Sequence, residues 1–311
     1  MAVLVAAQFS DDEWATWWPL LQAALPAEKL IRDADDFPRQ DIDVALVANP
    51  AEGSLRNLPS LRLIQSLWAG VDRLLADASV PTQTPLARMV DPAMNETMSQ
   101  TALWAVLSLH RGFFDYAQQQ RDGVWQQHAL SRADEITVSV LGLGQMGKAA
   151  AQRIARNGYR VLGWSTRTTQ AEGVETHAGI DSLSRVFAQS NVIVNLLPLT
   201  PATHGLFNAE AFARMPRGSS LVNLARGAHV VDADLLVALD AGHLHRAVLD
   251  VFEPEPLPST HPFWTHPRVT MLPHVAAQTD ARSAALIAAR NVHALREGRP
   301  LANLVDRSRG Y

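Results

Sequence analysis

The chain has 311 residues, enough for two domains with separate hydrophobic cores, and its 47% hydrophobic and 19% charged residues are ordinary for a globular protein. Its net charge of −4 argues against a nucleic acid or a membrane surface as a partner. Cysteine is absent, which excludes disulfides, thiolate chemistry and cysteine metal sites, and we expect no metal centre.

The first part of the chain, up to about residue 94, alternates short apolar segments with helical patterns. Residues 3–7 are too few for the apolar core of a signal peptide and are soon followed by Asp11, Asp12 and Glu13, so we interpret them as a strand. Further strands are predicted at residues 44–47, 63–66 and 86–90, and an amphipathic helix at residues 14–25. No run approaches the ~18 apolar residues of a membrane span. We therefore expect a cytoplasmic protein without a membrane partner.

A long apolar segment follows at residues 98–117, and we predict that it forms one helix. Its side chains include Leu103, Trp104, Val106 and Leu107, which makes it a candidate subunit interface. The polar residues 118–123 come next, before a second series of strands and helices begins at residue 136.

Three glycines, Gly142, Gly144 and Gly147, have the spacing GxGxxG. Residues 136–141 before them are apolar and β-branched, which predicts a buried strand, and residues 148–157 after them predict a helix. In a dinucleotide-binding turn the first glycine permits the tight turn, and the second lets a pyrophosphate approach the backbone. The third lets the helix pack close to the strand. The spacing alone is weak evidence, but strand, turn and helix in register predict a bound dinucleotide.

The next strand, predicted at residues 159–164, indicates which dinucleotide is bound. Such a strand should end on an Asp or Glu that binds the ribose 2′-hydroxyl. Here the chain has Ser165, Thr166, Arg167 and Thr168. Hydroxyls and a guanidinium would hold a 2′-phosphate that an acid would repel, so we predict NADP(H) as the preferred cofactor, with NAD(H) possible. Arg167 could also be an ordinary surface arginine, and that alternative stays open.

The remaining strands are predicted at residues 192–196, 220–223, 247–250 and 269–271, with helices between them. Strands that alternate with helices favour a parallel sheet, so we predict the α/β class. A final helix, predicted at residues 280–296, is expected to return to the first domain.

Residues capable of acid–base and anion chemistry follow three of these strands. Arg226 comes after the first, acids come after the second, and His274 comes after the third, at the sheet edge where α/β proteins bind ligands. The reduction of a 2-keto acid needs a guanidinium to hold oxygens, a histidine to transfer a proton and an acid to tune the histidine. The local sequence leaves the acid open, because Glu253 and Glu255 both precede a proline. Each residue alone could be purely structural.

Together with the glycine loop, this trio resembles the D-isomer-specific 2-hydroxyacid dehydrogenases, and most nearly their glyoxylate/hydroxypyruvate reductase A branch. The resemblance covers nearly the whole chain, including residues 69–72, residues 195–203 and the ending at residues 305–311. It implies two Rossmann-like or flavodoxin-like domains with parallel sheets, one inserted into the other. The implied substrate-binding (catalytic) domain comprises residues 1–95 plus 280–311, and the implied NADP-binding Rossmann domain comprises residues 96–279.

The resemblance also implies roles for the trio. Arg226 corresponds to the family's substrate-binding arginine, and His274 corresponds to its acid/base. The family places the partner acid five residues after the strand-end Asp250 and directly before a proline, which selects Glu255. Asp250 itself corresponds to the residue that contacts the nicotinamide carboxamide.

Other residues are assigned to substrate and cofactor in the same way. The backbone amides of Ala69, Gly70 and Val71 are expected to bind the substrate carboxylate. Trp68 stands where many relatives have a small residue, and we expect it to narrow the pocket toward acids of two or three carbons. The expected cofactor contacts are Gly142, Gly144, Gln145, Met146, Gly147, Ser165, Thr166, Arg167, Thr168, Leu197, Pro198, Thr203, Ala225, Asp250, His274 and Ala276.

The activity implied by the resemblance is NADPH-dependent reduction of glyoxylate to glycolate and of hydroxypyruvate to D-glycerate. Two alternatives stay open: a reductase of a bulkier 2-keto acid such as phenylpyruvate, and a non-catalytic, cofactor-sensing binding protein. The resemblance further implies a homodimer with Trp104 and Trp125 at its interface. The expected ligand is a small 2-keto or 2-hydroxy acid, and no nucleic acid partner is expected.

Overall fold

The computed structural model describes residues 1–310, which separate into two units, each with its own parallel sheet. Unit 1 comprises residues 1–93 and 279–310, and unit 2 comprises residues 94–278, so unit 2 is inserted into the chain of unit 1. The predicted fold class, two α/β domains with one inserted into the other, is confirmed. Tyr311, the last residue of the expected first domain, lies outside the described residues.

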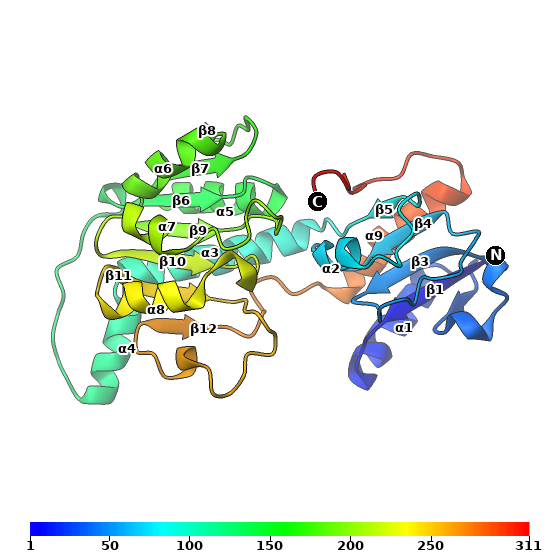
Figure 1. Cartoon of the computed structure of the whole chain (residues 1–311), viewed down its shortest axis with the longest axis horizontal. Coiled ribbons are helices and arrows are strands. Elements are labelled where there is room, and N and C mark those ends of the chain that lie inside the picture. The colour runs from blue at the N-terminus through cyan, green and yellow to red at the C-terminus, as the bar shows by residue number, and fades with distance from the viewer. Residues whose placement is uncertain (311) are drawn as a thin grey trace. The chain divides into compact units, whose positions relative to one another are not determined.

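The sheet of unit 1 has five parallel strands in the order β2-β1-β3-β4-β5, which is a flavodoxin-like order (Figure 1). Alternate residues of these strands, with Val71 and Leu74, form an apolar core on one face. The strands are β1 (Ala2–Ala7), β2 (Leu30–Ile31), β3 (Ile42–Ala48), β4 (Leu63–Ser66) and β5 (Leu86–Ala87). The helices are α1 (Asp11–Ala24), α2 (Asp72–Ala76) and α9 (Ala281–Arg296), and α1 contacts α9.

Helix α1 begins three residues before its predicted start. Ser10 and Glu13 form a capping box, in which the Ser10 hydroxyl accepts from the Glu13 amide and the Glu13 carboxylate accepts from the Ser10 amide. These two bonds satisfy backbone N–H groups that the first turn of a helix leaves without partners. The helix therefore starts at the cap rather than at the first tryptophan.

The sheet of unit 2 has seven parallel strands in the order β12-β11-β10-β9-β6-β7-β8 (Figure 1). The order reverses between β6 and β9, as in a Rossmann fold, and ligands of such sheets bind beyond the carboxyl ends of the strands at that point. The strands are β6 (Thr137–Leu141), β7 (Arg160–Ser165), β8 (Glu175–Ala178), β9 (Val192–Asn195), β10 (Ser219–Asn223), β11 (Leu244–Leu249) and β12 (Val269–Met271).

Helices cover both faces of this sheet, because its strands alternate apolar residues toward two cores. Val138 and Val140 pack in one core with α3 (Pro92–His110) and α5 (Gln145–Arg156). Ile193 and Leu221 pack in the other core with α6 (Ile180–Gln189), α7 (Ala209–Arg214) and α8 (Asp232–Asp240). Short 3₁₀ helices occur at Ala34–Asp36, Arg39–Asp41, Ala133–Glu135, Gly227–His229 (η4) and Pro262–Trp264 (η5).

The single helix predicted at residues 98–117 is wrong. Helix α3 ends at His110, and a second helix, α4 (Phe113–Asp122), begins after Gly112. Gly112 has a φ of +67°, a left-handed conformation that glycine adopts without strain and that interrupts a helix. The polar residues 118–122 are consequently the end of α4. Within residues 1–310, every helix is too short or too polar to cross a membrane.

Candidate active site

The glycine loop between β6 and α5 fits a bound pyrophosphate. A Cβ atom on Gly142 would lie 2.5 Å from the Leu196 carbonyl oxygen, and one on Gly147 would lie 1.7 Å from the Gly142 carbonyl oxygen. The fold itself therefore requires these two glycines. A Cβ on Gly144 would meet no atom of the described chain within 4 Å, so Gly144 borders open space. Among residues 1–310, no side chain caps the N-terminus of α5, which leaves its first amides available to an anion.

The loop after β7 carries the residues predicted to select the cofactor. The Ser165 hydroxyl donates to the Arg167 carbonyl oxygen and so shapes the turn. Thr166, Arg167 and Thr168 are exposed. Among residues 1–310, none pairs with the Arg167 guanidinium, which is therefore available to an external anion. The strand ends without a carboxylate, as the sequence shows.

His274 and Glu255 form a hydrogen-bonded pair on neighbouring loops of unit 2. The His274 Nδ1 atom lies 2.8 Å from Glu255 Oε2, and the Phe252 amide donates to Glu255 Oε1 at 2.9 Å. Burial raises the pKa of Glu255. The hydrogen bonds from His274 and the Phe252 amide, with the charges of His274 and Arg226, outweigh burial and hold this pKa below its ordinary value. Glu255 is therefore an anion that faces the histidine.

Asp250 fixes the turn on which His274 sits. Its carboxylate accepts hydrogen bonds from the amides of Val275 and Ala276, and its carbonyl oxygen accepts from the His274 amide. Burial raises the pKa of Asp250, and the backbone bonds oppose that rise. His274 has a φ of +55°, a left-handed conformation that is rare for a residue with a side chain. Asp250 thus holds His274 in an unusual backbone conformation, a role that the sequence did not predict.

Arg226 lies three residues after the end of β10, and its Nη1 atom donates to the Ala225 carbonyl oxygen at 2.7 Å. The next residue, Gly227, touches the loop of the His274–Glu255 pair, because a Cβ there would lie 2.1 Å from the Phe252 carbonyl carbon. Arg226, Glu255 and His274 therefore lie on adjoining loops of unit 2, and the Arg226 charge acts on Glu255. Leu197, Pro198 and Thr203 follow β9 in the same unit, where the Thr203 hydroxyl donates to the Pro198 carbonyl oxygen at 2.8 Å.

The predicted substrate-binding residues of unit 1 follow β4. The Ser66 hydroxyl binds both the amide and the carbonyl oxygen of Trp68, and the Trp68 carbonyl also accepts from the Met89 amide at 3.1 Å. The Trp68 ring makes edge contacts with Phe9 and Trp17 at centroid distances of 6.1 and 5.6 Å. Hydrogen bonds thus fix the Trp68 backbone, and aromatic contacts fix its ring, directly before residues 69–71.

Three residues of the unit 2 site were not predicted to have a role. Asn195, Asn223 and His229 are fully buried and form hydrogen bonds to one another or to the site loops. Asn195 and Asn223 end the strands β9 and β10, and a buried polar residue at a strand end was a readable signal. For His229 the sequence contains no such signal other than its position three residues after Arg226.

Comparisons with known proteins identify the family of this chain. The family described as D-isomer specific 2-hydroxyacid dehydrogenase, NAD binding domain, matches residues 103–276. Glyoxylate/hydroxypyruvate reductase A of Yersinia enterocolitica is 37% identical over 300 residues, which are 95% of this chain and 96% of that protein.

Two of the solved structures that are similar over the whole chain come from Xanthobacter and Sinorhizobium. One is a D-isomer specific 2-hydroxyacid dehydrogenase from Xanthobacter autotrophicus Py2 in complex with NADPH and MES. It has a TM-score of 0.93 and 38% identity, and the match covers 100% of this chain and 99% of that one. The other is an NADPH-dependent glyoxylate/hydroxypyruvate reductase from Sinorhizobium meliloti in complex with NADP and sulfate. Its TM-score is 0.92 and its identity 33%, over 100% of this chain and 99% of that one.

The chain therefore belongs to the D-isomer-specific 2-hydroxyacid dehydrogenase family, and it is an oxidoreductase. Within that family its curated relatives from Yersinia and from Serratia proteamaculans are both of the glyoxylate/hydroxypyruvate reductase A type.

Proposed function

We propose that the protein reduces small 2-keto acids with NADPH, converting glyoxylate to glycolate and hydroxypyruvate to D-glycerate. The observation that carries the proposal is the 2.8 Å contact between His274 and Glu255, with Arg226 on the adjoining loop. A proton donor, its anionic partner and an anion-binding cation are the groups that this reduction needs. The names of the relatives support the choice of substrate.

In the proposed mechanism each of the three side chains acts on one part of the substrate. NADPH, when bound, supplies the hydride. His274 uses Nδ1 to bind Glu255, which leaves Nε2 to give a proton to the substrate carbonyl oxygen. Glu255 fixes the ring orientation and stabilises the protonated imidazole before the transfer. Arg226 stabilises the negative charge that develops on that oxygen and holds the substrate carboxylate.

The substrate contacts proposed on unit 1 are the amides of Ala69, Gly70 and Val71, which would bind the carboxylate. Trp68 would limit the size of the substrate, since its ring is packed against Phe9 and Trp17 and cannot swing freely. This rigidity favours two- and three-carbon acids over phenylpyruvate. A rise in selectivity for phenylpyruvate over glyoxylate in Trp68→Ala would support this role.

For the cofactor, we propose that the loop from Gly142 to Gly147 and the first amides of α5 hold the pyrophosphate. Ser165, Thr166, Arg167 and Thr168 would bind the 2′-phosphate of NADP(H). The open space at Gly144 and the unpaired guanidinium of Arg167 support this within the described chain. Asp250 would reach the carboxamide, and the other contacts would be those of Gln145, Met146, Leu197, Pro198, Thr203, Ala225, His274 and Ala276. NAD(H) would bind more weakly, because it lacks the phosphate.

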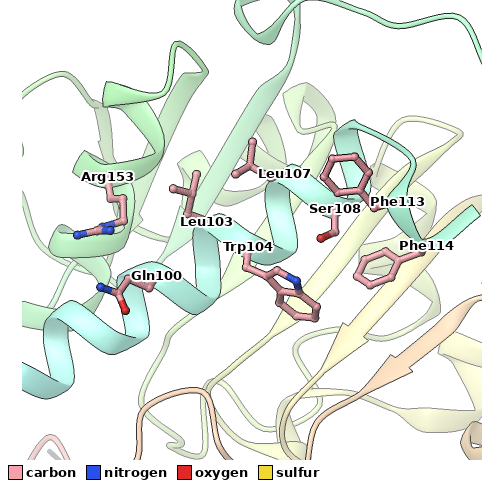
Figure 2. A pocket seen from close by; sticks show the side chains of 8 residues that line it. All are labelled: Gln100, Leu103, Trp104, Leu107, Ser108, Phe113, Phe114 and Arg153. Carbon is pink, nitrogen blue, oxygen red and sulfur yellow. The ribbon is translucent and has the colours of Figure 1, made fainter. Parts of the chain in front are cut away.

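We also propose a homodimer that forms through α3 and α4. A hollow of about 420 Å³ lies on these helices. Figure 2 shows Leu103, Trp104 and Phe113 among its lining residues. Trp104 is 40% exposed and Phe113 52% exposed, and Trp125 beyond α4 is 96% exposed. Contiguous exposed apolar side chains are typical of protein interfaces. The cytoplasmic location expected from the sequence stays a prediction.

The dimer is tested by light scattering after size exclusion. We expect twice the chain mass of 34.0 kDa for the natural protein and a monomer for Trp104→Glu. Trp264→Glu, which alters a comparably exposed tryptophan at η5, should leave the dimer intact. A monomer in the natural protein would contradict this proposal.

The function is tested by a kinetic panel of glyoxylate, hydroxypyruvate, pyruvate and phenylpyruvate with both cofactors. We expect the highest kcat/KM for the two small acids with NADPH. Preference for phenylpyruvate would favour the bulkier substrate class. Tight NADPH binding without turnover of any 2-keto acid would favour a cofactor-sensing protein.

A further inference from the structure

Two loops of the proposed site are joined by a buried polar cluster, Asn195, Asn223 and His229. All three side chains are 0% exposed. Asn195 ends β9, Asn223 ends β10, and His229 lies in η4 after Arg226. Buried polar groups are costly unless they are hydrogen-bonded, so the arrangement of these bonds is strongly constrained.

The neighbouring backbone fixes the orientation of both asparagines. Asn195 Oδ1 accepts from the Leu197 amide at 3.2 Å, and Asn223 Oδ1 accepts from the Ala225 amide at 3.3 Å. Reversal of either side chain would place its NH₂ group against a backbone N–H donor. The Asn195 Nδ2 atom is therefore a donor, and it donates to Asn223 Oδ1 at 3.0 Å and to His229 Nδ1 at 2.9 Å.

This orientation fixes the tautomer of His229. Because Nδ1 accepts a hydrogen bond from Asn195, it carries no proton, and the neutral ring has its proton on Nε2. The Nε2 atom lies 3.3 Å from the Pro198 carbonyl oxygen, which accepts that N–H. Both ring nitrogens are thus used, and both bind the segment at the end of β9, one at Asn195 and the other at Pro198.

The cluster holds the backbone of residues proposed to bind substrate and cofactor. The Arg226 carbonyl oxygen accepts from Asn223 Nδ2 at 2.9 Å and from the His229 amide at 3.3 Å. The Pro198 carbonyl oxygen accepts from His229 and from Thr203. Arg226 and Pro198 therefore share one partner, the His229 residue, although they lie on loops after different strands.

We infer that His229 is a positioning residue that locks the loop of Arg226 to the loop of Leu197, Pro198 and Thr203, so that the arginine and the cofactor contacts keep one geometry. This inference rests on the proposed function, because it assumes that both loops serve the reaction. A displacement of about 1 Å in a substrate-positioning group can reduce the rate by about 100-fold. Residues that touch neither ligand can have that effect through the backbone.

His243 provides a matched control for a merely structural histidine. Its Nε2 atom also lies near backbone carbonyl oxygens, those of Phe212 at 2.8 Å and Met215 at 3.1 Å. It directly precedes β11 and so lies at the amino edge of the same sheet, opposite the site loops. Loss of its bonds should affect stability alone.

The kinetic test compares His229→Leu, His229→Gln and His243→Leu. We expect His229→Leu to lower kcat/KM for glyoxylate by about 10- to 100-fold and to raise the KM for NADPH, since both loops lose a shared anchor. His229→Gln, whose amide has one donor and one acceptor side, should retain most of the kcat/KM that His229→Leu loses. His243→Leu should lower the melting temperature and keep the kinetic constants of the natural protein. Equal kinetic effects of His229→Leu and His243→Leu would overturn the inference.

Two further measurements do not depend on turnover. In the cofactor-free protein, long-range ¹H–¹⁵N correlation spectra should show His229 protonated on Nε2. Protonation on Nδ1 would contradict the hydrogen-bond arrangement inferred for the cluster. A fluorescence titration should show weaker NADPH binding by His229→Gln than by the natural protein, but stronger binding than by any folded His229→Leu. Unchanged NADPH binding in both variants would show that His229 does not position these loops. If the natural protein reduced no 2-keto acid, the proposed function would fail, while these two readouts would still decide the role of His229.

Discussion

The loops after β9 and β10 are held by buried hydrogen bonds, whereas the loop after β7 is exposed, although all three lie at the carboxyl edge of one parallel sheet. The first two are tied together by Asn195, Asn223 and His229, which are fully buried. The loop after β7 leaves Arg167 exposed and without a partner among residues 1–310. Proton and hydride transfer require fixed geometry, whereas recognition of a phosphate requires mainly a nearby positive charge. Substitutions in the loops after β9 and β10 should therefore lower activity equally with NADPH and with NADH. Substitutions in the loop after β7 should lower activity with NADPH alone.

The largest effect is expected for His274→Ala. Loss of the proton donor should lower kcat for glyoxylate by about 10²–10⁴-fold with NADPH and with NADH alike, because general acid catalysis contributes that much. His266→Ala is the matched control, since His266 also pairs with an acid, Asp240 at 3.1 Å, but precedes β12 at the amino edge. Steady-state kinetics check this, and near-normal turnover by His274→Ala would remove the histidine from the mechanism.

Arg226→Ala should lower kcat/KM for glyoxylate by about 10²–10³-fold, since it removes the charge that we propose to stabilise the developing oxyanion. The loss should again be similar with both cofactors. Arg217→Ala serves as control, because Arg217 also donates to a backbone carbonyl, that of Ala241, but lies before β10. A kcat/KM equal to that of the natural protein would show that Arg226 does not bind the substrate.

Arg167→Ala should weaken NADPH binding by about 10- to 100-fold, the usual contribution of a hydrogen-bonded charge. NADH binding should stay nearly unchanged, because NADH has no 2′-phosphate. The control is Arg160→Ala at the start of the same strand, where Arg160 pairs with Glu175. Fluorescence titration measures both dissociation constants. Equal losses for NADPH and NADH would show that Arg167 does not select the cofactor.

The smallest effect concerns stability in acid. The pKa of Glu255 lies below its ordinary value of 4.5, so its ionised form stabilises the folded protein above that pH. This stabilisation is lost as the pH falls through the folded-state value. Because Glu255 is partly exposed, the contribution should be about 1 kcal/mol or less. The natural protein should therefore melt at a higher temperature than Glu255→Gln near neutral pH. A melting-temperature gap that stays constant below the ordinary pKa would contradict this.

Much of the fold was predictable because its strands are short, buried and apolar on both faces. Such strands, as at β1, are visible in the sequence, and the glycine loop has a spacing that only a few conformations explain. Strand β8, with the sequence Glu-Thr-His-Ala, escaped prediction because it is a polar edge strand. The break between α3 and α4 escaped because one glycine in an apolar helical pattern is usually tolerated.

The trio of Arg226, Glu255 and His274 could be proposed because each follows a predicted strand, and parallel strands bring their carboxyl ends together. His229 could not be proposed in that way. Its partner Asn195 lies 34 residues away, and only the three-dimensional structure shows that their side chains meet. The Asp250 bonds to the amides of Val275 and Ala276 are similarly distant in sequence. Sequence motifs thus indicated the groups that we propose to react and missed the hydrogen bonds that hold them in place.

The central claim is NADPH-dependent reduction of a small 2-keto acid, and the most direct test follows NADPH oxidation by the purified natural protein in the presence of glyoxylate. The account predicts saturable oxidation with stoichiometric formation of glycolate, and a kcat/KM for NADPH at least about 10-fold above that for NADH. No oxidation with glyoxylate or hydroxypyruvate, or a kcat/KM for NADH equal to or above that for NADPH, would contradict it.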